Sequence, residues 1–196
     1  MGKQRTLLLI FSILALGTAI MCLFGCMRCA GTEKWREEVQ LSDGRVIVVE
    51  RETVWVGGGG EIVTSPGVKP KEYRIRFTNP DSSGQQIEWR STKNSPQTWP
   101  ESPLILDIKN GKPVVLTILS IDPVCEIYLK YSYLQGTWIE EKLPVEFEKS
   151  TTNLYLRESR NMPRFVDLKE KKENNEDMGY RQSLKQVGPN RKVCGL

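Results

Sequence analysis

Residues 104–119 read LILDIKNGKPVVLTIL and carry the clearest structural pattern of the chain. In its first half, Leu104, Leu106 and Ile108 point to one face and Asp107 points to the other. Alternation with a period of two residues is the pattern of a β-strand with one buried face. The stretch therefore predicts a core built from strands.

A two-residue turn divides this stretch into two strands. Asn110 and Gly111 both tolerate a positive φ, so they are a favoured pair for a tight β-hairpin turn. The returning segment, Val114–Leu119, is apolar at nearly every position, as expected of a strand that is covered on both faces. The sequence therefore predicts an antiparallel hairpin here.

The segment that follows this hairpin turns again at Gln135-Gly136. A tight turn at that point would pair Tyr133 with Trp138 and Lys130 with Glu141 across two antiparallel strands. The sequence thus predicts two further strands with a defined register.

Two alternating segments precede the hairpin. Tyr73–Phe77 and Ile87–Arg90 each alternate apolar with charged residues, and a turn separates them. Pairing them as a hairpin places Glu88 opposite Arg74 or Arg76, depending on the register. These arginines therefore have a structural explanation that needs no ligand.

Short strands of this kind, separated by turn residues, predict a mainly β fold: a single antiparallel β-sandwich or partly open barrel. An apolar helix is expected before it, and a charged, weakly helical tail after it, with the helix around Met178–Val187. The expected segments are a signal peptide or membrane anchor at 1–25, a polar spacer at 26–38, the β-domain at 39–156 and the charged extension at 157–196.

The first residues carry the pattern of an export signal. Lys3 and Arg5 precede Thr6–Gly25, which holds no charge. The tetrad Leu23-Phe24-Gly25-Cys26 resembles the lipobox of bacterial lipoprotein signal peptides. That resemblance implies cleavage before Cys26, attachment of diacylglycerol and fatty acyl chains such as palmitate at that cysteine, and, because Met27 rather than Asp follows, delivery to an outer membrane.

An uncleaved anchor is the alternative, because Thr6–Gly25 has about the twenty residues that a single-pass transmembrane helix needs. In both interpretations Lys3 and Arg5 keep the amino end in the cytoplasm. The remaining chain is then expected to face the periplasm, tethered to the outer membrane or, in the alternative, to the inner membrane.

Composition excludes several classes of function. The 196 residues carry a net charge of only +4, which does not predict a nucleic-acid partner, and they contain no histidine. Catalysis that needs histidine, and zinc sites built on it, are therefore excluded. We expect no enzyme, no cofactor and no metal site. The alternative is an envelope hydrolase that uses two carboxylates. Its candidates are Glu101, Asp107, Asp122 and Glu126.

The cysteines fit an exported chain. Cys22 lies in the apolar run, Cys26 would be lipidated and Cys29 would be held near the membrane, so Cys125 and Cys194 are the expected disulfide partners. The alternative is that Cys125 is a small buried side chain without a partner.

One region carries a candidate binding site. Trp89, Arg90, Lys93 and Trp99 bracket the proline-rich loop Ser91–Pro103. Aromatic faces beside polar groups can hold sugars or peptide strands, and binding residues are concentrated on loops. The alternative is that Trp89 belongs to the core and Trp99 packs the loop down.

These features together predict a membrane-tethered, extracytoplasmic lipoprotein that binds or scaffolds an envelope component, either a protein or a glycan. We expect the protein to be attached to the lipid bilayer through its N-terminus. The soluble part resembles the single-domain lipoproteins of Gram-negative bacteria, and this resemblance implies no activity. The alternatives are a single-pass membrane protein with the same outward domain, and the carboxylate hydrolase.

Overall fold

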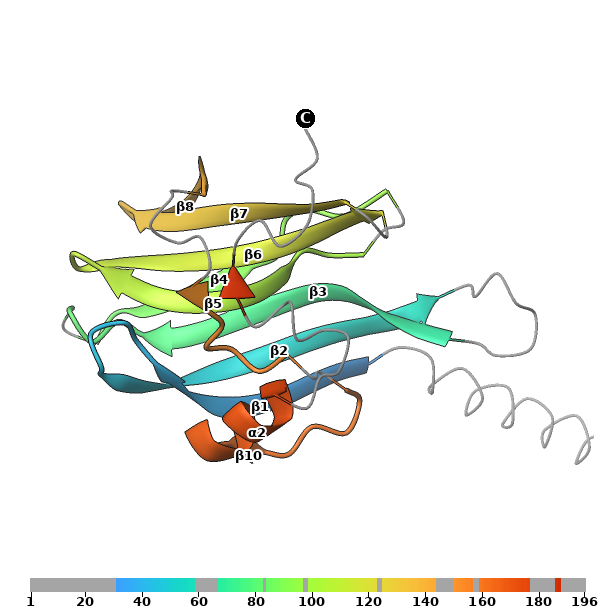
Figure 1. Ribbon diagram of the computed structural model, residues 1–196, viewed down its shortest axis with the longest axis horizontal. Helices are drawn as coiled ribbons and strands as arrows, with labels where there is room; N and C mark the ends of the chain where they lie inside the picture. Colours follow the sequence, from blue (N-terminus) through green and yellow to red (C-terminus); the bar gives the residue numbers. More distant parts are fainter. Residues whose placement is uncertain are drawn as a thin grey trace, which may run out of the picture. The chain divides into compact units, whose positions relative to one another are not determined.

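The structure, a computed structural model, describes residues 31–58, 67–82, 84–96, 99–122, 125–143, 150–156, 159–176 and 186–187. Within these residues the chain forms a five-stranded mixed sheet, a four-stranded antiparallel sheet, a two-stranded sheet and one short helix (Figure 1). The prediction of a mainly β fold is confirmed. The chain divides into two compact units, Met1–Gly31 with Trp55–Lys69 and Thr32–Val54 with Pro70–Leu196. The sites below lie in the second, larger unit.

The five-stranded sheet has the order β10-β1-β2-β3-β4. Its strands are β1 (Gly31–Gln40), β2 (Val46–Gly58), β3 (Gly67–Thr78), β4 (Gln86–Arg90) and β10 (Phe165–Val166). The pairing of β10 with β1 is parallel, which makes this sheet mixed rather than purely antiparallel as predicted. The difference arises because β10 comes from the distant C-terminal part of the chain, which can reach β1 in either direction.

The four-stranded sheet is antiparallel throughout, in the order β5-β6-β7-β8. Its strands are β5 (Ser102–Lys109), β6 (Lys112–Asp122), β7 (Cys125–Leu134) and β8 (Thr137–Lys142). These are the strands that the alternation and the turn residues predicted.

Turn chemistry fixes the hairpins of this sheet. Asn110 and Gly111 have φ angles of 52° and 73°, which confirms the predicted tight turn between β5 and β6. Between β7 and β8, Tyr133 lies opposite Trp138, with ring centroids 5.2 Å apart. The second predicted pair of this hairpin, Lys130 with Glu141, is also present, at 2.6 Å.

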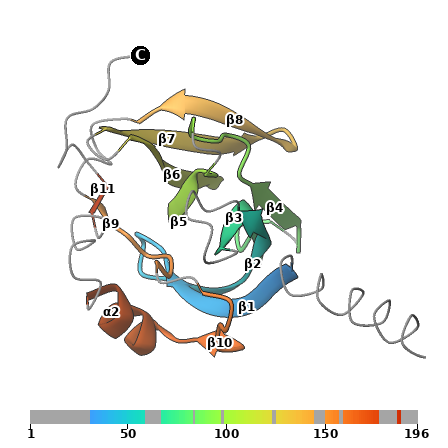
Figure 2. The ribbon, with the colours of Figure 1, turned by 90° about the vertical axis from the view of Figure 1, so that its right-hand side faces the viewer.

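Residues of both larger sheets share one hydrophobic core cluster. Its buried members from the strands are Val39, Val49, Tyr73, Ile75, Phe77, Ile87, Trp89, Leu106, Ile108, Val115 and Tyr131. Strands β7 and β8 lie across this core from β1 (Figure 2). A second cluster, which includes Leu116 and Tyr128, covers the other face of the four-stranded sheet. Strand β6 is therefore buried on both faces, as its uninterrupted apolar run predicted.

The prediction that Leu104 shares a face with Leu106 and Ile108 is wrong, because the register shifts between Pro103 and Ile105 and Leu104 lies in the second cluster. Asp107, on the face opposite Leu106, is buried as well. Its side chain was expected to face away from the core, yet the residue is only 4% exposed. The carboxylate accepts a hydrogen bond from the backbone N–H of Ser42 at 3.0 Å and pairs with Lys109 at 3.0 Å. Burial is tolerated because these partners replace water.

Strand β1 begins at Gly31, earlier than the strand-forming region expected from residue 39. Part of the expected polar spacer is thus a strand with a buried face. Trp35 is 2% exposed and Glu37 is fully buried. The charge of Glu37 interrupted the apolar pattern in the sequence, although Arg51 neutralises it in the fold.

The C-terminal part contains the helix α2 (Leu168–Glu176) and a two-stranded sheet of β9 (Ser150–Thr151) with β11 (Gln186–Val187). The helix expected around Met178–Val187 is wrong at its end, because Gln186–Val187 pairs as a strand, the conformation that β-branched valine favours. Residues 177–185 of that prediction lie outside the described residues.

Candidate functional site

The loop after β4, residues 91–101, presents the most exposed tryptophan of the described residues. Its two arms are tied together, since the backbone N–H of Ser95 donates to the Trp99 carbonyl at 2.8 Å and that of Glu101 donates to the Lys93 carbonyl at 3.0 Å. The backbone N–H of Trp99 also donates to Ser95 Oγ at 3.1 Å. The Trp99 residue remains 47% exposed. We call residues 91–96 and 99–101 the Trp99 loop; residues 97–98 between them lie outside the described part of the chain.

A fully buried carboxylate holds the Trp99 loop to the four-stranded sheet. Glu101 accepts hydrogen bonds from the Tyr131 hydroxyl at 2.7 Å and the Thr117 hydroxyl at 2.9 Å. It also accepts from the backbone N–H groups of Thr92 at 2.9 Å and Lys93 at 3.2 Å. Burial, together with the hydrogen bond to Glu101, raises the pKa of Tyr131. This carboxylate therefore links both arms of the loop to β6 and β7.

Two contacts at the surface extend this attachment to β8. Lys93 Nζ lies 2.7 Å from a carboxylate oxygen of Glu140. The indole N–H of Trp138 donates to the Glu88 carbonyl at 2.7 Å, which joins β8 to β4 beside the loop. The Trp99 loop is thus fixed between the two larger sheets.

The four residues of the sequence-predicted site divide between core and surface. Trp89 is only 1% exposed and packs at 5.9 Å from the Tyr131 ring, so it is a core residue. Arg90 is exposed and bonds to Glu88, and Lys93 is paired at the surface. Of the four, Trp99 alone combines a large apolar surface with exposure.

A closed network of charges covers the outer face of the five-stranded sheet. We call it the charge ring; it consists of Glu52, Glu72, Glu88, Arg74, Arg76 and Arg90. Each carboxylate contacts two of the arginines. Arg76 lies directly opposite Glu88, which selects one of the two registers that the sequence left open. The arginines therefore act within the sheet, as predicted.

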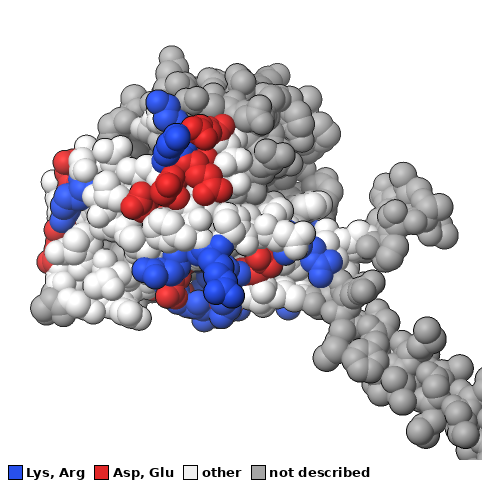
Figure 3. Space-filling model, turned by 90° about the horizontal axis from the view of Figure 1, so that it is seen from below, with Lys and Arg blue, Asp and Glu red and all other residues white. Residues whose placement is uncertain are grey.

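Glu52 is the centre of this network. Its side chain is only 4% exposed and contacts Arg74 at 2.6 Å, Arg76 at 2.9 Å and Lys34 at 3.2 Å. Burial alone would raise the pKa of Glu52, but hydrogen bonds from Arg76 and Lys34 outweigh it and lower the pKa. Elsewhere on the surface, basic and acidic side chains lie side by side, as the face in Figure 3 shows. That face is not the unbroken basic surface that attracts nucleic acid.

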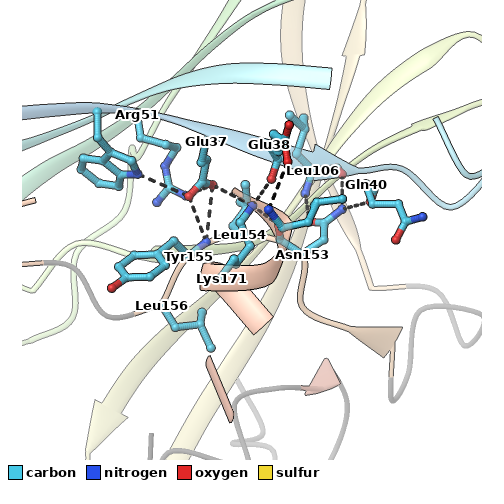
Figure 4. Close-up of polar contacts among 12 residues, drawn as sticks. Glu37, Glu38, Gln40, Arg51, Leu106, Asn153, Leu154, Tyr155, Leu156 and Lys171 are labelled. Atoms are coloured by element: carbon cyan, nitrogen blue, oxygen red, sulfur yellow. Dashed lines mark hydrogen bonds and ion pairs between the residues drawn. The ribbon is translucent and has the colours of Figure 1, made fainter. Parts of the chain in front are cut away.

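A second network is buried beneath α2. Glu37 of β1 contacts Arg51 of β2 at 3.1 Å and Lys171 of α2 at 3.6 Å (Figure 4). The Arg51 guanidinium lies over the Trp35 ring, 5.2 Å from its centroid. Burial lowers the pKa of Lys171 to about 8, although Glu37 opposes this shift.

Sequence reasoning did not single out these buried charged residues. A usable signal was the alternation of Trp35, Glu37, Val39 and Leu41, which extends the first strand backwards if a charged residue is accepted on its inner face. No comparable signal marks Lys171, because it lies in a run of lysines and glutamates that is typical of solvent-exposed helix.

The carboxylates considered for hydrolysis are engaged in structural contacts. Glu101 and Asp107 accept the hydrogen bonds given above, and buried Glu126 accepts one from the Tyr128 hydroxyl at 3.4 Å. The side chain of Asp122 lies outside the described part of the chain. No cluster of three metal-ligating side chains occurs among the residues that the structure describes.

Several predictions fall on residues that are not described. Cys26 and the apolar run Thr6–Gly25 lie outside the described residues, and among the described helices none is long and apolar enough to span a membrane. Cys125 is disulfide-bonded, so the alternative of an unpartnered thiol is wrong. Cys194 lies outside the described residues, so its pairing with Cys125 stays a prediction.

Comparison with known proteins adds no family. No family model, curated protein or solved structure matches this chain.

Proposed function

We propose that this chain is a membrane-tethered, extracytoplasmic lipoprotein whose β-domain binds an envelope component, a protein or a glycan, through the Trp99 loop. The observation that carries the proposal is the exposure of Trp99 on a loop that buried Glu101 fixes to the domain. The role is binding rather than catalysis.

The physical advantage of this arrangement is a low entropic cost of binding. A tryptophan offers a large apolar surface and an N–H donor, and such residues dominate the free energy of many interfaces. Because Ser95 and Glu101 already order the backbone around Trp99, a partner gains this surface without having to order the loop.

The tether in this proposal is supported by the first residues. Lys3 and Arg5 before the uncharged Thr6–Gly25 favour export, and the lipobox-like tetrad that ends at Cys26 favours lipid attachment there. An outer-membrane position, with the domain facing the periplasm, follows from the resemblance. A single-pass helix in the inner membrane is the alternative tether, and it leaves the same domain outside the cytoplasm.

For the domain we propose one antiparallel β-sandwich or partly open barrel, to which β10 adds in parallel. The shared core cluster of the two larger sheets supports this arrangement. Asn153 links β1 to β5, because its side-chain amide donates to the carbonyls of Gln40 and Leu106.

The test is chemical cross-linking in intact cells that produce the full-length chain, followed by purification and identification of the captured partners. Trp99→Ala should abolish capture of a specific partner while the melting temperature stays close to that of the parent. Phe165→Ala is the matched control, because Phe165 is a second exposed aromatic residue, 43% exposed, on a different element. Equal capture by the folded Trp99→Ala variant and the parent would exclude this loop as the binding surface.

A further inference from the structure

The ammonium group of Lys171 lies among oxygen acceptors that all come from outside its own helix. Its Nζ donates to the backbone carbonyls of Glu38 and, at 2.8 Å, of Asn153, and lies 3.6 Å from Glu37 Oε1 (Figure 4). The residue is only 4% exposed. We call these three acceptors the ammonium site.

The Glu37 carboxylate of this site is positioned without help from α2. Arg51 contacts it at 3.1 Å, and the indole N–H of Trp35 donates to it at 3.3 Å. The backbone N–H of Tyr155 donates to it at 3.2 Å. The carboxylate is therefore oriented by β1, β2 and the segment after β9.

The Asn153 carbonyl is positioned in the same way. The Asn153 side chain accepts a hydrogen bond from the backbone N–H of Leu106 at 3.0 Å. It donates to the carbonyls of Leu106 at 2.8 Å and Gln40 at 2.9 Å. Residues of β1 and β5 thus hold Asn153 through contacts that do not involve Lys171.

Helix α2 makes few buried contacts with the rest of the domain apart from that of Lys171. Within α2, the buried residues are Lys171 and, one turn later, Asn175. The Asn175 side chain accepts from the backbone N–H of Leu156 at 3.0 Å and donates to the Leu154 carbonyl at 3.0 Å. A helix of nine residues with so small an apolar face is marginal without tertiary contacts. Two polar side chains, together with the backbone N–H of Leu168, therefore dock it.

The surroundings of Lys171 only partly stabilise its charged ammonium form. Glu37 and Glu38 of β1 attract its ammonium group, whereas Arg51 of β2 repels it, and burial removes its hydration. The Glu38 carboxylate also accepts a hydrogen bond from the backbone N–H of Leu168, at the start of α2. The carboxylate and the Asn153 carbonyl are held by contacts that do not involve Lys171, so another primary ammonium group would meet the same acceptors.

We propose that the ammonium site is a receptor for a primary ammonium group, that Lys171 occupies it as an internal ligand, and that the lysine side chain of a protein partner binds there when α2 is displaced. The two carbonyls accept hydrogen bonds from two of the three N–H donors of a primary ammonium, and the carboxylate supplies the opposite charge. A quaternary ammonium has no such donors. This inference does not depend on the Trp99 loop or on the membrane tether.

The first test uses the full-length chain with Lys171→Ala and the probe n-propylammonium, which replaces the atoms that the substitution removes. The substitution should lower the melting temperature, and millimolar propylammonium should restore at least half of the loss. The controls are 1-propanol, which lacks the charge, and tetramethylammonium, which lacks the donors. Restoration by propylammonium alone supports the receptor, whereas no restoration, or equal restoration by a control, overturns it.

A second measurement covers the case in which Lys171→Ala does not fold. In the parent chain, propylammonium should accelerate amide hydrogen exchange within α2 and leave exchange in β6 unchanged, while 1-propanol should do neither. Unchanged exchange in α2 at saturating propylammonium would overturn the proposal.

The partner part of the proposal has its own test. A peptide with the sequence of Leu168–Glu176 should bind the Lys171→Ala chain, and the same peptide with Lys171→Met should bind at least tenfold more weakly. Binding of propylammonium without binding of the lysine peptide would reduce the site to one for small amines and overturn the protein-partner assignment.

Discussion

The hydroxyl of Tyr131 donates a hydrogen bond of 2.7 Å to the buried carboxylate of Glu101, thirty residues away in the sequence. This contact joins the base of the Trp99 loop to the centre of β7. Glu101 lies two residues from the exposed Trp99, so the contact attaches this end of the loop to the four-stranded sheet.

Replacing Glu101 by Gln should loosen the Trp99 loop. The new amide group would face at least one of the donors of Tyr131, Thr117 or Thr92 with a donor of its own, so we expect a loss of about 1–3 kcal/mol in the free energy of unfolding. Urea denaturation measures the loss, and amide exchange at Thr92 should accelerate. The control is Glu140→Gln, which removes a surface ion pair.

That control should cost less than about 1 kcal/mol, because the Lys93–Glu140 pair is largely exposed. An equal effect of the two substitutions would show that Glu101 has no special role in ordering the loop.

The two tryptophans near the loop should respond differently to truncation. Trp89→Ala removes a core residue that is 1% exposed and should cost about 3–5 kcal/mol. Trp99→Ala should change stability by less than about 1 kcal/mol, because nearly half of the residue is already in water. Thermal unfolding distinguishes them. A large loss for Trp99→Ala would mean that it packs the loop down.

Stability should rise as the pH increases from about 8 towards 10.5. The folded state holds the pKa of Lys171 at about 8, below its ordinary value of 10.5, so the unfolded chain binds more protons in this window. The gain from this group is on the order of 3 kcal/mol, since each pKa unit corresponds to about 1.4 kcal/mol. Urea denaturation of the parent and of Lys171→Met checks it, and the variant should lack this component. Identical pH profiles would contradict the assignment.

Acid should weaken the charge ring through Glu52. The pKa of Glu52 in the folded state lies below its usual value of 4.5, so its contribution is present above that value and is lost as the pH falls through the lowered pKa. Glu52→Gln should cost about 1–3 kcal/mol at neutral pH and flatten the acid limb of the stability profile. Glu72→Gln, whose side chain is 24% exposed, should do less.

Local chemistry predicted much of the fold. Asn110 and Gly111 both tolerate a positive φ, so these two residues located the central hairpin in the sequence. Both have a positive φ in the structure. The turn at Gln135-Gly136 then determined the partners of the next strand, and Tyr133 indeed faces Trp138. In these cases the information lies within a few residues of the contact that it specifies.

Ion pairs between residues that are far apart in the sequence could not be predicted. Glu37 made the first strand look like a solvated spacer, because its partner Arg51 is on another strand and Lys171 is in the C-terminal part of the chain. The parallel pairing of β10 with β1 had no local signal either, since two residues such as Phe165–Val166 carry no detectable periodicity.

The sequence predicted the candidate loop and its tryptophan, but not the residue that attaches the loop to the domain. The loop and Trp99 were visible as a proline-rich segment with an aromatic residue. The role of Glu101 could not be predicted, because nothing in the sequence indicates that four other residues donate hydrogen bonds to its carboxylate. Trp89 is buried in the core, as the alternative to a binding role had predicted.

Whether lipid on Cys26 tethers the β-domain outside the cytoplasm can be measured through the intact mass of the protein extracted from membranes. We expect a chain that begins at Cys26, with residues 1–25 removed, and that carries the added mass of diacylglycerol and acyl groups. A full-length mass with Met1 retained and no added lipid would contradict it.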